Sequence, residues 1–214
     1  MLLKNIKLVV FDWDGTLMDS TNRIVSSMQG AAKITHLPIP SSVSVKQLIG
    51  LNLQVAFKTL FPFASKQQSE QLFKHYRELY VSVDETPSPL YDGAENCLQR
   101  LKDNHIKVAI ATGKARFGFE RVLNEVPHIK PFLDDSICDD ESESKPKPDM
   151  LIQLANRQAM AFEQMLMVGD TEFDLMMAFN AGVKCVGVSH GAHPVEQLLK
   201  CHPSKIIDHL DELK

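Results

Sequence analysis

Pairs of acidic residues follow two short apolar runs of this 214-residue chain. Asp12 and Asp14 come directly after residues 6–11, and Asp170 and Asp174 come after residues 165–168. Four carboxylates that lie close together repel one another unless a cation neutralises them. Oxygen ligands favour a hard ion, and Mg²⁺ is commonly held by one or two carboxylates together with substrate phosphate. These acids are therefore candidates for a Mg²⁺ site that also takes an anionic substrate.

A hydroxyl group and an ammonium group accompany the acids. Thr112 ends a third apolar run, and Lys145 stands in a loop just before a proline. Lys114 and Lys147 compete with Lys145 as the residue that binds an anion. In an open parallel sheet, ligands bind beyond the carboxyl ends of the strands. We therefore expect these side chains to converge at one edge of a sheet.

Strands and helices that could position these residues alternate along most of the chain. Short apolar runs predict buried strands over residues 6–11, 107–112, 165–168 and 184–188. Helical spacing predicts helices over residues 93–104, 115–125, 149–160 and 172–181. Such alternation is typical of a parallel sheet that is covered on both faces. The expected fold class is α/β, with a Rossmann-like parallel sheet, helices on both faces and an inserted all-helical cap.

The inserted block interrupts the alternation, because no strong strand pattern occurs within it. Helical patterns cover residues 20–35, 43–60 and 66–82, and prolines separate them. We expect a helical cap domain over residues 18–87, and an α/β hydrolase core domain made of residues 1–17 and 88–214. The cap would be hinged near residues 16–19 and 84–90. The alternative is a helical elaboration that packs rigidly on the core.

Composition excludes several classes of protein. Apolar residues make up 44% of the chain, charged residues make up 23%, and the net charge is −4, an ordinary globular balance. An acidic chain has no general attraction to nucleic acid or to an anionic membrane. No apolar run approaches the length of about 20 residues needed to span a bilayer, and the N-terminus does not resemble a signal peptide. We expect a cytoplasmic protein without a nucleic-acid or membrane partner, and the oligomeric state is left open.

The four cysteines do not predict a disulfide framework. Cys97, Cys138, Cys185 and Cys201 are widely spaced, and none of their spacings is that of a zinc site. Two histidines and a further His-Cys pair cluster near the C-terminus, at His190, His193, Cys201 and His202. Their spacing is irregular, so we do not expect a metal there. We expect the four cysteines to be small thiol side chains in the core or at the surface.

Four motifs together resemble the haloacid dehalogenase-like hydrolase superfamily, and within it the phosphoglycolate-phosphatase-like phosphatases. They are Phe11-Asp12-Trp13-Asp14-Gly15-Thr16-Leu17 with Asp19-Ser20, Ala111-Thr112-Gly113-Lys114, Lys145-Pro146-Lys147-Pro148-Asp149, and Gly169-Asp170-Thr171 with Asp174. The first motif is specific by itself, and the others gain specificity from their order and spacing. The resemblance covers essentially the whole chain, and the helical block matches the position of that family's mobile cap.

This resemblance implies a role for each acid. Asp12 would be the nucleophile that forms an aspartyl-phosphate. Asp14 would first protonate the leaving oxygen and then activate water. Mg²⁺ would be held by the Asp12 and Asp170 carboxylates and by the backbone carbonyl of Asp14. Asp174, the second acid of the metal motif, would either lie near the ion or orient Lys145.

The resemblance also implies the residues that bind the phosphoryl group. Thr112 and Lys145 would hold its oxygens, and the backbone N–H groups of Trp13 and Gly113 would add donors. Lys145 fits the family spacing best, whereas we expect Lys114 to lie on the following helix. We expect the Trp13 side chain to face the core, with a place in the site floor as the alternative. For Thr171 we expect a helix N-cap rather than a hydroxyl that serves the site.

The acid at Asp14 points to cleavage of a phosphate ester or anhydride. The true haloacid dehalogenases and the phosphonoacetaldehyde hydrolases, which also resemble this scaffold, lack an acid at that position. We expect a Mg²⁺-dependent phosphatase that acts on a small phosphorylated metabolite, with phosphoglycolate as a lead. The alternatives are a β-phosphoglucomutase-type sugar-phosphate mutase, a pyrophosphatase, and a non-catalytic binding protein on the same scaffold. The cap residues that could contact a substrate are Arg23, Lys46, Asn52 and Arg77, although a solvated helix face is the expected position of each.

Overall fold

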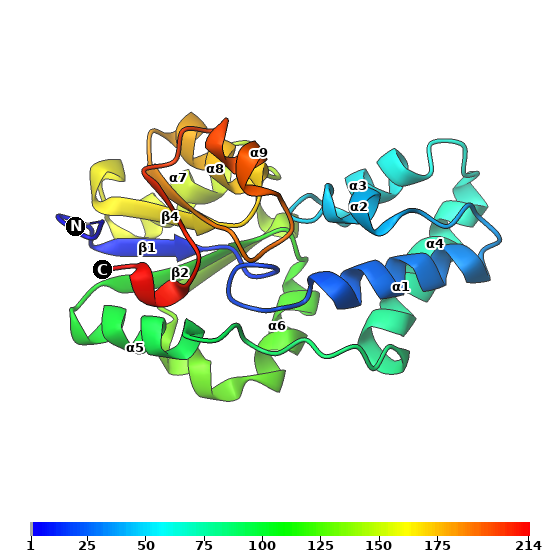
Figure 1. Cartoon of the computed structure of the whole chain (residues 1–214), viewed down its shortest axis with the longest axis horizontal. Coiled ribbons are helices and arrows are strands. Elements are labelled where there is room, and N and C mark those ends of the chain that lie inside the picture. The colour runs from blue at the N-terminus through cyan, green and yellow to red at the C-terminus, as the bar shows by residue number, and fades with distance from the viewer. Residues whose placement is uncertain (1) are drawn as a thin grey trace.

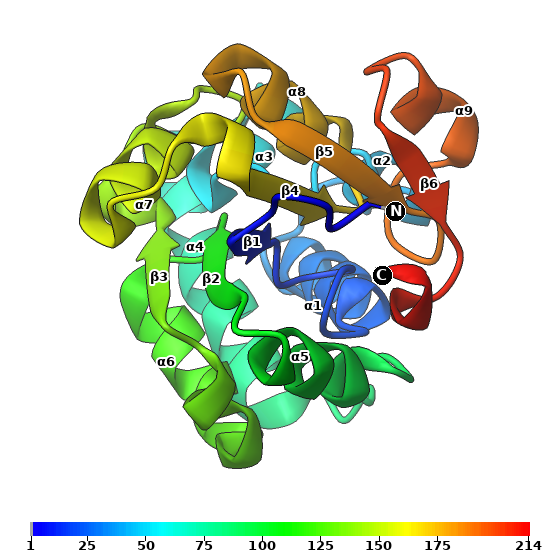
Figure 2. The ribbon, with the colours of Figure 1, turned by 90° about the vertical axis from the view of Figure 1, so that its left-hand side faces the viewer.

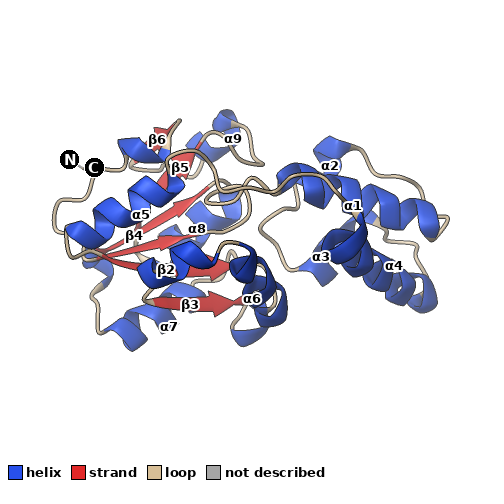
Figure 3. Ribbon diagram, turned by 90° about the horizontal axis from the view of Figure 1, so that it is seen from below, coloured by secondary structure: helices blue, strands red, loops and turns tan. Residues whose placement is uncertain are grey.

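A six-stranded sheet with helices on both faces forms one part of the molecule, and a group of helices lies beyond one end of the sheet (Figures 1 and 3). The computed structural model describes residues 2–214. Its strands are β1 (Leu8–Phe11), β2 (Lys107–Thr112), β3 (Asp135–Cys138), β4 (Met165–Gly169), β5 (Lys184–Val188) and β6 (Lys205–Ile207). All neighbouring strands are parallel, in the order β3-β2-β1-β4-β5-β6. The predicted α/β class with a parallel sheet is therefore confirmed.

Alternate residues of the central strands bury opposite faces of the sheet. Val9 and Phe11 pack toward α5 (Ala94–Asp103) and α6 (Arg116–Glu125). Leu8 and Val10 pack toward α7 (Asp149–Gln158) and α8 (Glu172–Ala181). Figure 2 shows the two helix layers on either side of the strands, with the short α9 (Val195–Leu199) near β6. Because helices cover both faces of the sheet, the central strands appear in the sequence as continuous apolar runs.

The four predicted strands are present, but β3 and β6 were not predicted. These two strands lie at the edges of the sheet and are only four and three residues long. Two of the four β3 residues are polar, Asp135 and Ser136. Short polar edge strands limit pairing with other chains, and they carry no apolar run that a pattern could detect.

The helical block contains α1 (Thr21–Ile34), α2 (Ser42–Lys46), α3 (Leu53–Leu60) and α4 (Lys66–Glu78), followed by a π-helical turn over Leu79–Val83. The single helix predicted over residues 43–60 was wrong. Gly50 breaks it, because its φ of +94° lies outside the helical region, and the Asn52 side chain then caps α3 by accepting from two backbone N–H groups. Within the block α1 packs on α4, and the Phe57 ring meets the edges of Phe73 and Tyr76.

Two chain segments connect the helical block to the sheet, and they run side by side. Met18 pairs with Leu90, the Asp19 N–H donates to the Pro89 carbonyl at 2.8 Å, and the Tyr91 N–H donates to the Leu17 carbonyl at 2.9 Å. The domain boundaries that we expect from the sequence fall in these segments. The division into a core and a separately moving cap stays a prediction.

The cysteines agree with the prediction that they do not form a disulfide framework. Cys97, Cys138, Cys185 and Cys201 are all free thiols, and the first three are buried. Among residues 2–214 no helix is both long enough and apolar enough to cross a bilayer.

Helix α7 offers a direct test of how the sheet face is packed. Leu151 is fully buried against the sheet, whereas its neighbour Ile152 is 37% exposed. Leu151→Ala should lower the free energy of unfolding by about 2–5 kcal/mol, because it leaves a cavity in the core. Ile152→Ala is the matched control and should cost less than about 1 kcal/mol. Urea denaturation followed by circular dichroism measures both, and equal losses would contradict the packing described.

Candidate active site

The candidate residues converge where the strand order reverses. From β1 the chain adds strands on one side through β2 and β3, and then on the other side through β4, β5 and β6. Asp12 and Asp14 follow β1, Thr112 ends β2, and Asp170 follows β4, so their side chains share one edge of the sheet. The loop before α7 brings Lys145 to the same edge, 2.7 Å from Asp12. This is the position at which parallel α/β sheets bind ligands.

Lys145 lies buried between two carboxylates. Its Nζ atom is 2.7 Å from Asp12 Oδ1 and 2.6 Å from Asp174 Oδ1, and all three side chains are essentially inaccessible to solvent. The other oxygen of Asp12, Oδ2, is buried without a hydrogen-bond partner. An orphaned carboxylate oxygen in the interior is costly, so Asp12 is poised to contact a further group.

Asp174 contacts Lys145, which is one of the two expectations for its position. Its Oδ1 atom accepts from Lys145, and its Oδ2 atom accepts from the Thr171 hydroxyl at 2.7 Å and the Thr171 N–H at 3.1 Å. One carboxylate oxygen from each of Asp12, Asp170 and Asp174 also lies within 4.8 Å of the others. Thr171 is the N-cap of α8 and forms a capping box with Asp174, as we expect from the sequence.

Two hydrogen bonds that we did not predict from the sequence fix the carboxylate of Asp170. Its Oδ1 atom accepts from the Thr16 hydroxyl at 2.8 Å, and its Oδ2 atom accepts from the Ala192 N–H at 2.7 Å. A Cβ atom on Gly15 or Gly191 would collide with this carboxylate. Both glycines are therefore needed so that the backbone can approach Asp170 closely. Gly191 belongs to no recognisable motif, so no sequence signal pointed to it.

Burial makes the charged forms of these acids unfavourable. Burial raises the pKa of Asp12 well above its usual range, although the charge of Lys145 opposes this effect. Burial and the neighbouring Asp174 raise the pKa of Asp170 to about 7. Burial by itself would lower the pKa of Lys145, but the Asp12 and Asp174 charges outweigh it and raise that pKa. Three buried carboxylates thus face a single ammonium group, which leaves an excess of negative charge.

The acidic group fits a divalent cation. It offers only oxygen ligands, it carries more negative than positive charge, and the Oδ2 atom of Asp12 has no partner. Hard oxygen ligands of this kind suit Mg²⁺. The Asp14 carboxylate is not part of this group, and a contribution from its backbone carbonyl stays a prediction. Among residues 2–214 no other group of three or more acidic, His or Cys side chains comes close enough together to hold an ion.

Asp14 lies beside the acidic group and has partners of its own. The Ser20 hydroxyl donates to its Oδ1 atom at 2.5 Å, and Lys114 Nζ lies 3.0 Å from its Oδ2 atom. The expectation that Lys114 lies on the following helix was wrong, because α6 begins only at Arg116. Lys114 stands in the turn after β2 and also donates to the Tyr80 hydroxyl of the helical block at 3.3 Å.

The remaining predicted phosphate ligands lie close to this turn. Thr112 is fully buried at the end of β2, and its hydroxyl accepts from the Lys114 N–H at 3.2 Å. At Gly113 a Cβ atom would press on the carbonyl of Gly50, so the helical block approaches the core closely there. The Trp13 side chain faces the core, as we expect, with its ring edge-on to Phe119 at 5.1 Å. Whether these groups bind phosphate stays a prediction.

A cavity of about 580 Å³ opens between these residues and the helical block. Asp12, Asp14, Gly113 and Lys114 contribute to its lining. Of the cap residues singled out in the sequence, Asn52 and Arg77 also line it. Asn52 is half-buried, whereas Arg77 is exposed, as we expect from the sequence. Arg23 packs over the Tyr80 ring instead, 5.3 Å from its centroid. Lys46 ends α2 and is not among the lining residues.

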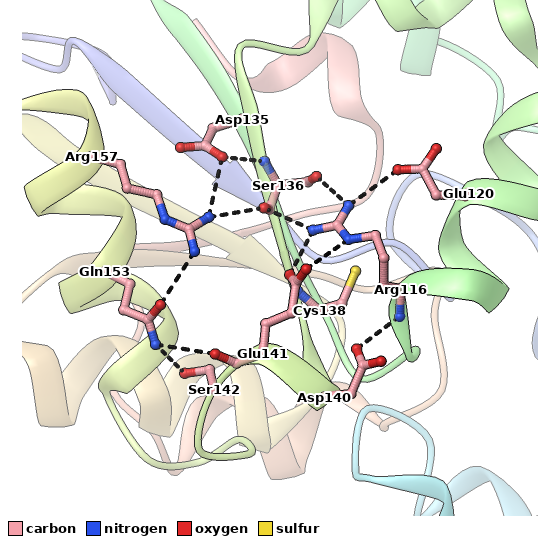
Figure 4. A network of polar contacts seen from close by, with 10 residues as sticks. All are labelled: Arg116, Glu120, Asp135, Ser136, Cys138, Asp140, Glu141, Ser142, Gln153 and Arg157. Carbon is pink, nitrogen blue, oxygen red and sulfur yellow. Dashed lines mark hydrogen bonds and ion pairs between the residues drawn. The ribbon is translucent and has the colours of Figure 1, made fainter.

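A polar network anchors the loop that leads to Lys145 (Figure 4). The Arg116 guanidinium donates to Glu141 at 2.6 and 2.9 Å and to the Ser136 hydroxyl at 2.8 Å. Glu141 in turn accepts from the Cys138 N–H at 2.9 Å. Three acids of the run over residues 139–143 are nevertheless exposed, namely Asp140, Glu141 and Glu143. Its first member, Asp139, is buried and accepts from Asn52 of the helical block.

The raised pKa of Asp170 predicts how stability depends on pH. An unfolded Asp titrates near pH 4, so between about pH 4 and 7 the folded protein binds more protons. The associated stability is present below about pH 4 and is lost as the pH rises through about 7. In EDTA, Asp170→Asn should reduce the fall in Tm between pH 5 and 8 by about 2–4 °C, the change that about 1 kcal/mol produces in a chain of this size.

Differential scanning calorimetry measures this effect, and Asp103→Asn on the exposed end of α5 is the matched control. The control variant should keep the pH dependence of the wild-type protein. The same dependence in Asp170→Asn would contradict the assignment.

Comparisons with known proteins agree with this geometry. The family model described as haloacid dehalogenase-like hydrolase matches residues 9–188. A phosphoglycolate phosphatase of Vibrio cholerae is 30% identical over 219 residues, covering 99% of this chain and 96% of that protein. Two solved structures share the fold at lower identity, and each is covered almost completely. One is a hydrolase of Pseudomonas syringae, with a TM-score of 0.86 and 21% identity, covering 97% of this chain and 95% of that chain. The other is a haloacid dehalogenase-like family protein of Streptococcus pneumoniae, with a TM-score of 0.81 and 24% identity, covering 98% of this chain and 97% of that chain. The chain thus belongs to the haloacid dehalogenase-like hydrolase family, in its phosphoglycolate-phosphatase-like group, and is an enzyme of the phosphatase type.

Proposed function

We propose that this enzyme is a Mg²⁺-dependent phosphatase that hydrolyses a small phosphate monoester through an aspartyl-phosphate on Asp12. The observation that carries the proposal is the state of Asp12. This carboxylate lines the cavity, has one oxygen fixed by Lys145, and has the other without a partner. A buried, oriented carboxylate with a free oxygen is suited to attack phosphorus. Phosphoglycolate, named for the Vibrio cholerae relative, is the first substrate to test.

In the first step a carboxylate oxygen of Asp12 would bond to phosphorus while the bond from phosphorus to the leaving oxygen breaks. Asp14 would give its proton to that oxygen, so that the product leaves as a neutral alcohol. Contacts with Ser20 and Lys114 hold the Asp14 carboxylate beside the cavity, which is the position this transfer needs.

In the second step Asp14 would take a proton from water, and the water oxygen would attack the aspartyl-phosphate. The bond between phosphorus and the Asp12 oxygen breaks, inorganic phosphate is released, and the Asp12 carboxylate is regenerated. Asp14 is then protonated again and ready for the next cycle. Lys145 stays between Asp12 and Asp174 and opposes negative charge throughout.

Asp12 and Asp170, with Asp174 close by, would hold Mg²⁺. When bound, the ion would neutralise charge on the phosphoryl oxygens, which is its general contribution to phosphoryl transfer. Thr112, Lys145 and the backbone N–H groups of Trp13 and Gly113 would hold the phosphoryl group itself. We also propose that residues 18–87 act as a cap that closes over the bound ester.

A panel of phosphorylated metabolites, assayed with Mg²⁺ and with EDTA, tests the proposal. We expect phosphate release that needs Mg²⁺ and falls by about 10⁴-fold or more in Asp12→Asn. Lys145 keeps its contact with Asp174 in that variant, so the fold should survive, as circular dichroism would show. Substantial phosphate release by folded Asp12→Asn would overturn the proposal. Interconversion of sugar phosphates without release would indicate the mutase instead.

The leaving group gives a separate test of Asp14. Asp14→Asn should slow the hydrolysis of alkyl phosphates by about 10²–10⁴-fold, because an alkoxide needs a proton to leave. p-Nitrophenolate is stable as an anion, so p-nitrophenyl phosphate should be affected much less in the first step. Rapid-quench measurement of p-nitrophenol and of the alcohol gives both rates. An equal loss for the two esters would contradict the role of general acid.

A further inference from the structure

His193 joins the helical block to the core at a point outside the cavity. It stands in the loop between β5 and α9, which Figure 1 shows reaching toward α2, and its side chain is buried. The Nδ1 atom accepts from the Glu172 N–H at 3.2 Å, and the Nε2 atom lies 3.3 Å from the Gln47 carbonyl oxygen. Glu172 begins α8, whereas Gln47 directly follows α2. One imidazole ring therefore contacts both parts of the molecule.

The two partners of this ring fix its protonation state. A backbone N–H can only donate, so the Nδ1 atom of His193 carries no proton. A carbonyl oxygen can only accept, so the Nε2 atom carries a proton and donates to Gln47. The first N–H groups and the last carbonyl groups of a helix have no partner within that helix. The neutral ring thus satisfies one helix end in the core and one in the helical block.

The helical block lies directly against the core beside this contact. A Cβ atom on Gly50 would come within 2.9 Å of the Thr171 hydroxyl oxygen and 3.6 Å of the Phe173 ring, so the backbone of the block reaches the first turn of α8. The Phe173 ring in turn packs edge-on against the His193 ring, with 5.4 Å between the two centroids. Residues 47–52 therefore rest on the first turn of α8.

The segment that His193 holds also borders the site. Residues 48–52 line the cavity together with Asp12. On the core side, the backbone N–H of His193 donates to the Asp170 carbonyl at 3.4 Å, and the Ala192 N–H donates to the Asp170 carboxylate at 2.7 Å. His193 thus links one wall of the cavity to the backbone that carries Asp170.

We propose that His193 is a positioning residue, whose hydrogen bond to the Gln47 carbonyl holds residues 47–52 against α8 and keeps the cavity closed over the acids. Its ring does not line the cavity, so it acts through Gln47. The proposal rests on the proposed phosphatase and on closure of the helical block over the ester. Affinity for a ligand that both parts contact falls with the closed fraction of the protein. Loss of this hydrogen bond should therefore weaken substrate binding.

Two amide side chains separate the contacts of the ring. In His193→Asn the amide oxygen takes the place of Nδ1 and accepts from Glu172, but the side chain is too short to reach Gln47. In His193→Gln the amide nitrogen takes the place of Nε2 and donates to Gln47, whereas the contact with Glu172 is lost. The proposal predicts a defect in His193→Asn only. A role limited to capping α8 predicts the reverse order.

Hydrogen–deuterium exchange, followed by mass spectrometry, measures the opening of residues 47–52 without turnover. Peptides that cover them should exchange about threefold to tenfold faster in His193→Asn than in the wild-type protein, the effect expected from the loss of one hydrogen bond. In His193→Gln this hydrogen bond is kept, so the rates should stay within about twofold of wild type. Equal rates in the two variants, or faster exchange in His193→Gln, would overturn the proposal.

His202→Asn makes the same substitution at an exposed histidine and is the matched control. His202 has a φ of +51°, a conformation that Asn adopts readily, so the variant should fold. It should keep the wild-type exchange rates over residues 47–52, and circular dichroism would show that all three variants are folded. The same acceleration in this control as in His193→Asn would contradict a specific role of the contact with Gln47.

The best substrate of the phosphorylated-metabolite panel tests whether the contact serves the reaction. His193→Asn should raise KM about threefold to tenfold and change kcat by less than about twofold, because saturating substrate restores the closed arrangement. His193→Gln should keep both constants. An unchanged KM in His193→Asn would overturn the proposal. Absence of hydrolysis by the wild-type enzyme would instead count against the phosphatase, and the exchange rates would still test His193.

Discussion

Lys145, buried between Asp12 and Asp174, is the interaction on which the arrangement of the site depends. Three segments far apart in the sequence must bring one ammonium and two carboxylates together without water. A buried charge that loses its partner is strongly destabilising, so these segments cannot drift apart independently. With Asp170 nearby, the group still carries an excess of negative charge. The same contacts that fix Asp12 therefore also create a place for a divalent cation.

The sheet meets this constraint through the order of its strands. Because β1 and β4 are neighbours at the point where the order reverses, Asp12 and Asp170 follow strands that lie side by side. Gly15 and Gly191 leave room for the Asp170 carboxylate, and the Ala192 N–H fixes it. Neither the sheet by itself nor the glycines by themselves would place the acids. Together they hold carboxylates closer than their repulsion would otherwise permit.

The helical block completes the site from the opposite side. Gly50 approaches Gly113, Asn52 donates to Asp139, and Lys114 reaches Tyr80. These contacts belong to the turn after β2, the loop after β3 and the π-helical turn that follows α4. The polar and cationic groups of the cavity thus come from both parts of the chain. A substrate large enough to contact both sets of groups would make all of these contacts only when the two parts are closed together.

The sequence by itself determined the central strands, most helices and the acids at the sheet edge. A strand buried on both faces must be an apolar run, and a helix that covers it must repeat its apolar residues at helical spacing. Local patterns of this kind are visible without knowledge of the fold. Together with the order of the motifs, they sufficed for the class of fold and for Asp12, Asp14, Lys145 and Asp170 as candidates.

Only the tertiary structure decided which side chains meet. The edge strands β3 and β6 are short and carry no clear apolar run, and the break at Gly50 follows from a positive φ that no periodicity reveals. Lys114 points to Asp14 and Tyr80, and Asp139 is buried, because segments distant in sequence close over them. Contacts of this kind depend on strand order, on turns and on the packing of the helical block. They are set by the whole fold, because the partner of each charge lies dozens of residues away.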